Sequence, residues 1–297
     1  MVCARLANMP PLIQGEVFVS DFRDQNFLID DMRFTTHGTA YFCSNPCPET
    51  IVFVHGVGML GAVWKHQLNY FSSSYQTLAY DLLGHGKSPM PPQEVSLDDY
   101  VEQLNELVDF LELSSFYLVG HSMGAIISVA FALKYPNKVL ALTPMNMVFN
   151  RTDKAQLEVL NRANQVLKGN QILNIEQTID RWFKNDNNKK SENINEVRKW
   201  LEQSSPQGYG LTYRLFALSD KVFLNKLKRL SCPVLYLTGD DDPNSTSEMS
   251  QKMAEMTPLG KFVTVEDEAH MMSYIAPNKV NPIIENHLKT SKENPGE

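Results

Sequence analysis

The stretch FYLVGHSMGAIISVAFAL, residues 116–133, decides the fold. Phe116–Val119 is a short apolar run of the kind that forms a buried strand, and Ala125–Leu133 has the composition of a buried helix. Between them lies Gly-His-Ser-Met-Gly, in which Ser122 stands at a sharp strand-to-helix turn. Glycines on both sides fit this turn, because a β-carbon has no room where strand and helix pass closely. The pattern predicts a strained turn that lifts the Ser122 hydroxyl above a sheet.

On either side, short apolar runs recur and alternate with longer helix-like segments. The runs are Ile51–Val54, Thr77–Tyr80, Lys138–Leu142, Pro233–Leu237 and Phe262–Val265. Leu97–Leu111 is typical of the helices, because its leucines and valines fall on one helical face. This alternation indicates an α/β fold with a mostly parallel sheet flanked by helices. Gly15–Ser20 and Arg33–Phe42, which contain several aromatic residues, predict an antiparallel edge.

The middle of the chain has a different pattern, because no clean buried strand occurs between about residues 150 and 230. Its helical segments are Lys154–Leu167, Ile175–Phe183, Ile194–Gln203 and Tyr209–Leu218, and polar stretches such as Asn185–Ser191 link them. A C-terminal helix is expected around Ile283–Leu288. We therefore expect a core of residues 1–145 and 231–297 with an inserted helical cap, residues 146–230.

Composition excludes several classes of protein. The 297 residues carry 27 basic and 34 acidic side chains, a formal net charge of −7. Such a chain repels phosphate backbones and anionic lipid headgroups, so we expect neither a nucleic-acid nor a membrane partner. The four cysteines are too few and too scattered for a disulfide framework, and Cys43 and Cys47 could form only half a zinc site, because no second Cys/His pair has the required spacing. These features predict a soluble, cytoplasmic protein without a metal or cofactor; the sequence leaves a homodimer open.

Ser122 is a candidate nucleophile, which needs a base and a third group to orient that base. His270 follows the last expected strand, and Asp240-Asp241-Asp242 follows the strand before it. Asp242, fixed in direction by Pro243, is the first choice of acid, with Asp240 and Asp241 as alternatives. His287 is the rival base, but its polar surroundings predict that it faces solvent.

A second motif, His55-Gly56-Val57-Gly58, follows the strand Ile51–Val54. A loop here can present the Val57 N–H beside the Met123 N–H, and two such donors stabilise an oxyanion. His55 itself is expected to bond nearby backbone.

The same loop also matches a dinucleotide-binding fingerprint. Residues 56–61 read Gly-Val-Gly-Met-Leu-Gly, and Asp81 follows Gly61 by 20 residues. Some fifty residues precede the supposed first strand, however, and Asp81 opens another glycine-rich loop. A nicotinamide-dependent oxidoreductase is therefore a remote alternative.

Taken together, these motifs resemble the α/β-hydrolase family over nearly the whole chain. The matching stretches, in family order, are His55-Gly56, Asp81–Ser88, the elbow at Ser122, Gly239–Asp242 and His270. The resemblance implies an eight-stranded sheet with a helical cap between the sixth and seventh strands. It also favours Asp242, because the family's acid comes last in the G-x-x-D pattern. Serine in the nucleophile position argues against a haloalkane dehalogenase.

Within the family, the chain is most similar to catabolic members: enol-lactonases, ring-cleavage-product hydrolases and amidomethylene-succinate hydrolases. The resemblance implies a cofactor-independent hydrolase of a small, carboxylate-bearing ester, lactone or amide. Cap arginines are then expected to bind the carboxylate; the candidates are Arg151, Arg162, Arg181 and above all Arg214, which has the most apolar neighbours. Trp182 and His121 are also expected at the substrate. A C–C hydrolase and a non-enzymatic ligand receptor are the alternatives.

Overall fold

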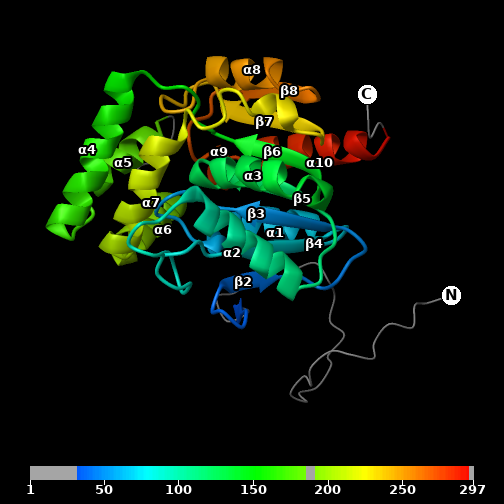
Figure 1. Cartoon of the computed structure of the whole chain (residues 1–297), viewed down its shortest axis with the longest axis horizontal. Coiled ribbons are helices and arrows are strands. Elements are labelled where there is room, and N and C mark those ends of the chain that lie inside the picture. The colour runs from blue at the N-terminus through cyan, green and yellow to red at the C-terminus, as the bar shows by residue number, and fades with distance from the viewer. Residues whose placement is uncertain (1–31, 185–190, 294–297) are drawn as a thin grey trace.

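A computed structural model describes residues 32–184 and 191–293, and these residues form one eight-stranded sheet with helices on both faces (Figure 1). The strand order is β1-β2-β4-β3-β5-β6-β7-β8. The strands are β1 (Arg33–Phe34), β2 (Ala40–Cys43), β3 (Thr50–Val54), β4 (Gln76–Tyr80), β5 (Phe116–His121), β6 (Val139–Met145), β7 (Val234–Gly239) and β8 (Gly260–Val265).

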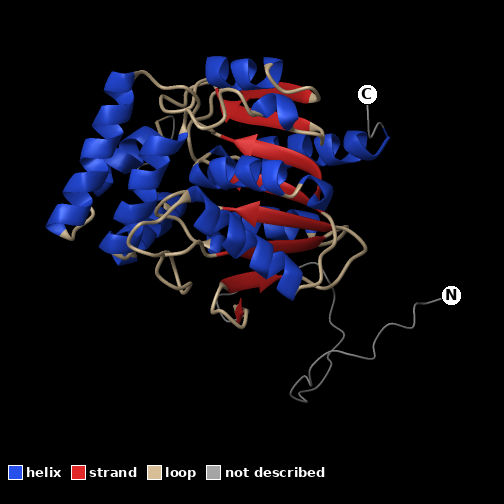
Figure 2. Ribbon diagram, in the orientation of Figure 1, coloured by secondary structure: helices blue, strands red, loops and turns tan. Residues whose placement is uncertain are grey.

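The sheet is parallel except at one edge (Figure 2). β1 pairs antiparallel with β2, and β2 pairs antiparallel with β4, whereas every later pairing is parallel. The mostly parallel α/β fold is confirmed. The expected strand Arg33–Phe42 is interrupted, because residues 35–39 form a turn between β1 and β2. The expected strand Gly15–Ser20 lies outside the described residues.

Helices cover both faces of the sheet. α2 (Leu97–Phe110) packs against α3 (Met123–Lys134) on the near face in Figure 1, and α1 (Lys65–Phe71) packs against α10 (Pro277–Glu293) behind it. Ser96 and Asp99 form a reciprocal capping box that fixes the start of α2. Short helices α8 (Ser247–Glu255) and α9 (Met272–Ile275) and 3-10 turns η2 (Gly61–Trp64), η3 (Pro136–Lys138) and η4 (Leu227–Arg229) complete the connections.

Between β6 and β7 the chain leaves the sheet for a group of helices that we call the cap. These are α4 (Asp153–Gly169), α5 (Ile175–Trp182), α6 (Glu192–Gln203) and α7 (Pro206–Ser219). They gather at the left of Figure 1, at the carboxyl ends of the strands. The exact borders of the unit, placed at residues 146 and 230, stay a prediction.

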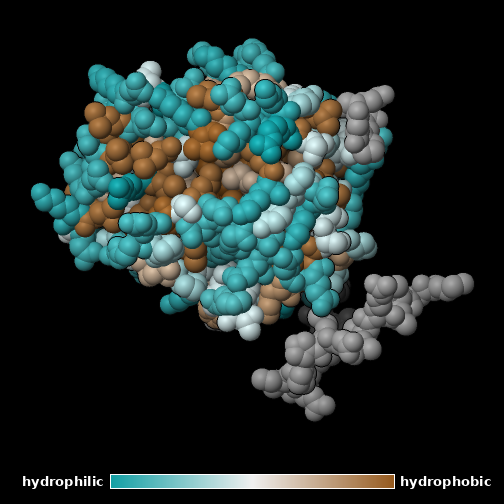
Figure 3. All heavy atoms as spheres, in the orientation of Figure 1, coloured by the Kyte–Doolittle hydropathy of each residue, from teal (hydrophilic) through white to brown (hydrophobic). Residues whose placement is uncertain are grey.

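The cap presents apolar surface to solvent as well as to the core. On the face drawn in Figure 3, apolar side chains gather over the cap and where it meets the sheet. Leu157, Leu173 and Leu218 are large apolar residues of this segment that remain exposed. Within the described part of the chain, no helix has the length and apolar character needed to cross a bilayer.

Candidate active site

The turn from β5 into α3 holds Ser122 in a strained backbone conformation. Its φ is 55° and its ψ is −115°, a region that a residue with a β-carbon rarely adopts. A β-carbon at Gly120 would lie 2.3 Å from the Gly124 carbonyl oxygen, and one at Gly124 would lie 2.1 Å from the Val54 carbonyl oxygen. Glycine is therefore required at both positions, as the sequence pattern predicts. The turn places Ser122 in the wall of a pocket.

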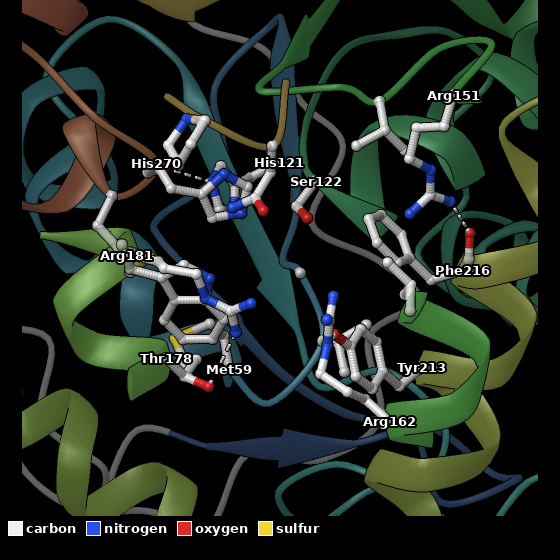
Figure 4. Close-up of a pocket in the computed structure, with 18 of the residues that line it drawn as sticks. Met59, His121, Ser122, Arg151, Arg162, Thr178, Arg181, Tyr213, Phe216 and His270 are labelled. Carbon is white, nitrogen blue, oxygen red and sulfur yellow. Dashed lines mark hydrogen bonds between the residues drawn. The ribbon is translucent and has the colours of Figure 1, made fainter. Parts of the chain in front are cut away.

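His270 and Asp242 meet beside this turn. The two residues follow β8 and β7, and His270 Nδ1 lies 2.7 Å from Asp242 Oδ2. Both side chains are almost completely buried. Because Asp242 Oδ2 can only accept, His270 carries its proton on Nδ1, which leaves Nε2 free to accept a proton. His270 and Ser122 line the same pocket (Figure 4).

Asp242 is held as an anion by several donors. Asn244 N–H and Ser245 N–H donate to Oδ1, while Ser245 Oγ and Asn146 Nδ2 donate to Oδ2. Burial alone would raise the pKa of this carboxyl, but the His270 ring and these hydrogen bonds hold the pKa well below its ordinary value. Asn146 and Ser245 were not predicted as site residues from the sequence. No motif marks them, although Asn146 has the left-handed φ of 48° that follows the end of β6.

The neighbouring acids have other partners. Asp240 Oδ1 accepts the N–H of Glu268 at 3.3 Å, and Asp241 forms an ion pair with Lys184 at 3.1 Å. Of the three aspartates, Asp242 is therefore the one whose carboxylate reaches His270.

The expectation that His287 faces solvent is wrong. Its side chain is buried against the sheet, and its Nε2 donates to the Leu142 carbonyl oxygen at 3.2 Å. Burial lowers the pKa of His287 to about 4, so the ring is neutral at pH 7. Polar sequence neighbours gave a false signal because they lie on other faces of α10.

The loop after β3 lies against the elbow. A β-carbon at Gly56 would lie 3.0 Å from Ser122 Cβ. Gly58 N–H donates to His85 Nε2 at 3.0 Å, and Met59 N–H donates to the Gly56 carbonyl at 3.2 Å. Val57 lines the pocket, and Met123 is the first residue of α3, where backbone N–H groups have no partner within the helix. This arrangement keeps Val57 and Met123 as the candidate oxyanion donors.

His55 bonds the backbone, as expected. Its Nδ1 donates to the Gly56 carbonyl at 2.7 Å, and its Nε2 accepts the Leu82 N–H at 2.9 Å. Burial and the neighbouring His85 ring hold the pKa of His55 well below its ordinary value. The neutral ring ties the loop after β3 to the loop after β4.

Two rings enclose the imidazole of His270. The His121 ring lies 4.7 Å from it, and the Trp182 ring stacks on it at 5.8 Å with an interplanar angle of 29°. His121 Nε2 donates to the His270 carbonyl oxygen at 2.8 Å. Burial, followed by the His270 ring, lowers the pKa of His121 to about 3, so His121 is neutral at pH 7.

The pocket above Ser122 has a volume of about 420 Å³ and opens between the sheet and the cap (Figure 4). The sheet side contributes Val57, Met59, Ser122 and His270, and the cap side contributes aromatic residues, three arginines and one acid, Glu158. The aromatic residues are Trp182, Tyr209, Tyr213 and Phe216. An apolar wall with a few charged groups is typical of a small-molecule site.

The three pocket arginines differ in their partners. Arg151 is buried and paired with Asp220 at 3.3 Å, and its Nη2 also donates to the Phe216 carbonyl at 3.0 Å. Arg162 donates from Nε to the Tyr213 hydroxyl at 3.2 Å, and Arg181 donates from Nη2 to Thr178 Oγ1 at 3.3 Å. Neither Arg162 nor Arg181 pairs with a carboxylate of the described residues. Within the described residues their hydrogen-bond partners are neutral hydroxyls, so no described carboxylate neutralises either guanidinium charge.

The prediction that Arg214 binds the substrate's carboxylate is wrong. Its side chain is exposed, and it is not among the residues that line the pocket. The physical reason is helical geometry: neighbours in the sequence point about 100° apart. Tyr213 and Phe216 face the pocket while Arg214 between them faces solvent.

Comparison with known proteins identifies the family to which the chain belongs. A model of the α/β hydrolase fold matches residues 49–277. The chain belongs to the α/β-hydrolase family. It is 35% identical over 260 residues to (E)-2-((N-methylformamido)methylene)succinate hydrolase of Acinetobacter baylyi, covering 88% of this chain and 98% of that protein. It is 25% identical to 3-oxoadipate enol-lactonase 2 of the same organism, over 80% of this chain and 88% of the other.

Solved structures agree on the fold. A thermophilic esterase from Thermogutta terrifontis superposes with a TM-score of 0.77 at 24% identity, covering 88% of this chain and 98% of the other. An enol-lactonase from Burkholderia xenovorans gives a TM-score of 0.77 at 18% identity, over 87% and 99% of the two chains. The family and its relatives support a hydrolase built on an eight-stranded sheet.

Proposed function

We propose that this α/β-hydrolase is a serine hydrolase of a small substrate that carries carboxylates, with amidomethylene-succinates as the first candidates. One observation carries the proposal: Arg181 and Arg162, both without a carboxylate partner in the described chain, line the same pocket as Ser122 and His270. The 35% identity to a hydrolase named for such a succinate supports the same substrate class.

The geometry supports a two-step acyl transfer. Ser122 Oγ attacks the scissile carbonyl while its proton passes to His270 Nε2, and Asp242 stabilises the imidazolium through Nδ1. The N–H groups of Val57 and Met123 receive the charge that develops on the carbonyl oxygen. His270 then protonates the nitrogen or oxygen of the leaving group, the C–N or C–O bond breaks, and the leaving group departs. A water molecule that gives its proton to His270 attacks the acyl-enzyme and releases the acid and Ser122.

Charge and burial support the assignment of the arginines. A guanidinium binds a carboxylate through two parallel hydrogen bonds, and these are strong when water is excluded. Arg151 already has Asp220 as its counter-ion, so an incoming carboxylate would have to compete for it. Arg162 and Arg181 come from α4 and α5, and both side chains lie in the pocket of Figure 4. A substrate with two carboxylates can engage both.

The test is a substrate panel assayed by mass spectrometry. It contains (E)-amidomethylene-succinates, a 3-oxoadipate enol-lactone, a ring-cleavage product with a C–C bond to be hydrolysed, and neutral esters. We expect the highest kcat/KM on an amidomethylene-succinate. Higher kcat/KM on the enol-lactone or on the C–C substrate would move the assignment to that bond. Tight binding of a panel member without turnover would indicate a receptor and overturn the proposal.

A further inference from the structure

The C-terminal end of the cap helix α5 is attached to the loop that carries His270. The carbonyl oxygen of Trp182 accepts the N–H of Met271 at 3.2 Å, and the Trp182 ring stacks on the His270 ring at 5.8 Å. Lys184, two residues beyond the helix, pairs with Asp241 at 3.1 Å. The loops that carry His270 and Asp242 are thus both bonded to the end of one cap helix.

His270 is enclosed by contacts from both parts of the molecule. Its side chain is 5% exposed. The Trp182 ring from the cap stacks on the imidazole, and the His121 ring from the end of β5 lies next to it. Asp242 fixes Nδ1. An imidazole can turn about its Cβ–Cγ bond, and such a turn would take Nδ1 away from Asp242 and change the direction of Nε2 in the pocket that His270 shares with Ser122. A large flat ring packed on the imidazole restricts this rotation.

The adjacent residue faces the pocket. Arg181 precedes Trp182 in α5, and its Nε is buried without a hydrogen-bond partner in the described chain. An anion bound there would satisfy this donor. The binding group and the ring on His270 therefore lie on the same helical turn.

We propose that Trp182 is a positioning residue that holds His270 in its working orientation, so that the cap helix which binds the substrate's carboxylate also aligns the general base. This rests on the proposed function in two respects, namely that His270 serves Ser122 as its base and that Arg181 of α5 binds a substrate carboxylate. It adds a role for the cap in the chemical step, besides its role in binding.

The experiment uses the full chain and two activated esters, neutral 4-nitrophenyl acetate and the hemiester 4-nitrophenyl succinate. We expect W182L to lower kcat on both esters by roughly 10- to 100-fold, because a small misplacement of a catalytic group has effects of this size. KM for the neutral ester should change little. W182F, which keeps an aromatic ring on His270, should retain kcat within about threefold.

The matched control is W200L. Trp200 is the other tryptophan of the cap; it is buried, whereas Trp182 is partly buried, and it packs on Tyr274 and is not among the pocket residues. W200L should lower the melting temperature while keeping kcat within about threefold, measured well below both melting temperatures. A fall in kcat as large as that of W182L would show a general effect of cap packing and overturn the positioning role.

A spectroscopic measurement gives an independent readout. The proton between His270 Nδ1 and Asp242 Oδ2 should give a far-downfield NMR resonance in the wild type and W182F, and this resonance should broaden or vanish in W182L. Unchanged kcat and an unchanged resonance in W182L would overturn the inference. R181Q tests the proposed function separately, through the ratio of KM values for the charged and neutral esters. That ratio can stay constant even if Trp182 positions His270, so the two failures are distinguishable.

Discussion

Asp81 Oδ1 accepts the backbone N–H of Gly61 at 2.8 Å. The two residues are 20 positions apart, as in a dinucleotide-binding fingerprint. In this fold the spacing brings them together in a structural hydrogen bond. Oδ2 accepts the N–H of Lys87 at 2.9 Å, and Asp81 is 1% exposed. A β-carbon on Gly86 would collide with this carboxylate, so the glycine-rich loop packs on the acid itself. The carboxylate joins two loops rather than presenting itself to a ribose.

Replacing Asp81 by Asn should destabilise the protein. One accepting oxygen is lost, and a buried N–H is left opposite an amide N–H₂, which costs about 1–3 kcal/mol. Urea unfolding of D81N and wild type measures the difference. Addition of NAD⁺ should leave the wild-type melting temperature unchanged, and a clear rise would revive the dinucleotide interpretation.

Replacing Ser122 by Ala should abolish turnover without unfolding the protein. The loss in kcat should be roughly 10⁶-fold, as expected when a nucleophile is removed. Steady-state kinetics and circular dichroism measure the two properties, and labelling by a fluorophosphonate should disappear in parallel. Turnover retained within tenfold would contradict a serine mechanism.

Replacing Asp242 by Asn should lower kcat by roughly 10⁴-fold, because the amide no longer holds His270 in the right tautomer. Stability gives a second readout. Since the pKa of Asp242 lies well below its ordinary value in the folded protein, its contribution is complete above about pH 4 and is lost as the pH falls further. Wild type should therefore lose more stability than D242N between pH 4.5 and pH 2.5, measured as urea midpoints.

Arg181 and Arg162 should control the affinity for carboxylates. We expect R181Q and R162Q each to raise KM for a dicarboxylate substrate by roughly 10- to 100-fold, since a charged hydrogen bond contributes about 1.5–3 kcal/mol. R214Q, whose side chain lies in solvent, is the matched control and should leave KM within twofold. An effect of R214Q equal to that of R181Q would place the carboxylate elsewhere.

Acidification should destabilise the protein partly through His287. Its pKa is lowered by burial to about 4, whereas an unfolded histidine titrates near 6.5. The neutral ring thus stabilises the fold above about pH 6.5, and this contribution is lost as the pH falls toward 4. H287Q keeps a donor for the Leu142 carbonyl and does not titrate. Between pH 7 and pH 5, wild type should lose about 1–2 kcal/mol more stability than H287Q in urea unfolding.

The strands and the elbow could be predicted because burial constrains their sequences strongly. The buried run at β3 and the strand-turn-helix at Ser122 allow few residue types. The short helices α1 and α8 escaped prediction. Residues 65–71 of α1 bury Gln67 with Leu68 and Phe71, so its inner face is partly polar and gives no clear apolar period.

The direction of individual side chains on helices could not be predicted from the sequence. Asp242, His270 and the turn at Ser122 follow the carboxyl ends of β7, β8 and β5, so their approximate meeting point follows from topology. The predictions for Arg214 and His287 were wrong, because the composition around a helical residue says little about the face of the helix on which that residue lies. Asn146 carries no signal beyond its position after β6, yet it donates to the carboxylate that holds His270.

Arg162 and Arg181 come from the helices inserted between β6 and β7, whereas Ser122, Asp242 and His270 follow strands of the sheet. Under the proposed function, reactivity and choice of ligand are thus encoded in separate stretches of the chain. Replacing α4 and α5 by those of another family member should then change which acid or ester binds, while Ser122, Asp242 and His270 stay in place. The transplanted α5 would have to keep a tryptophan at position 182, because without this ring the helix could bind its ligand but would not restrict the rotation of the His270 imidazole.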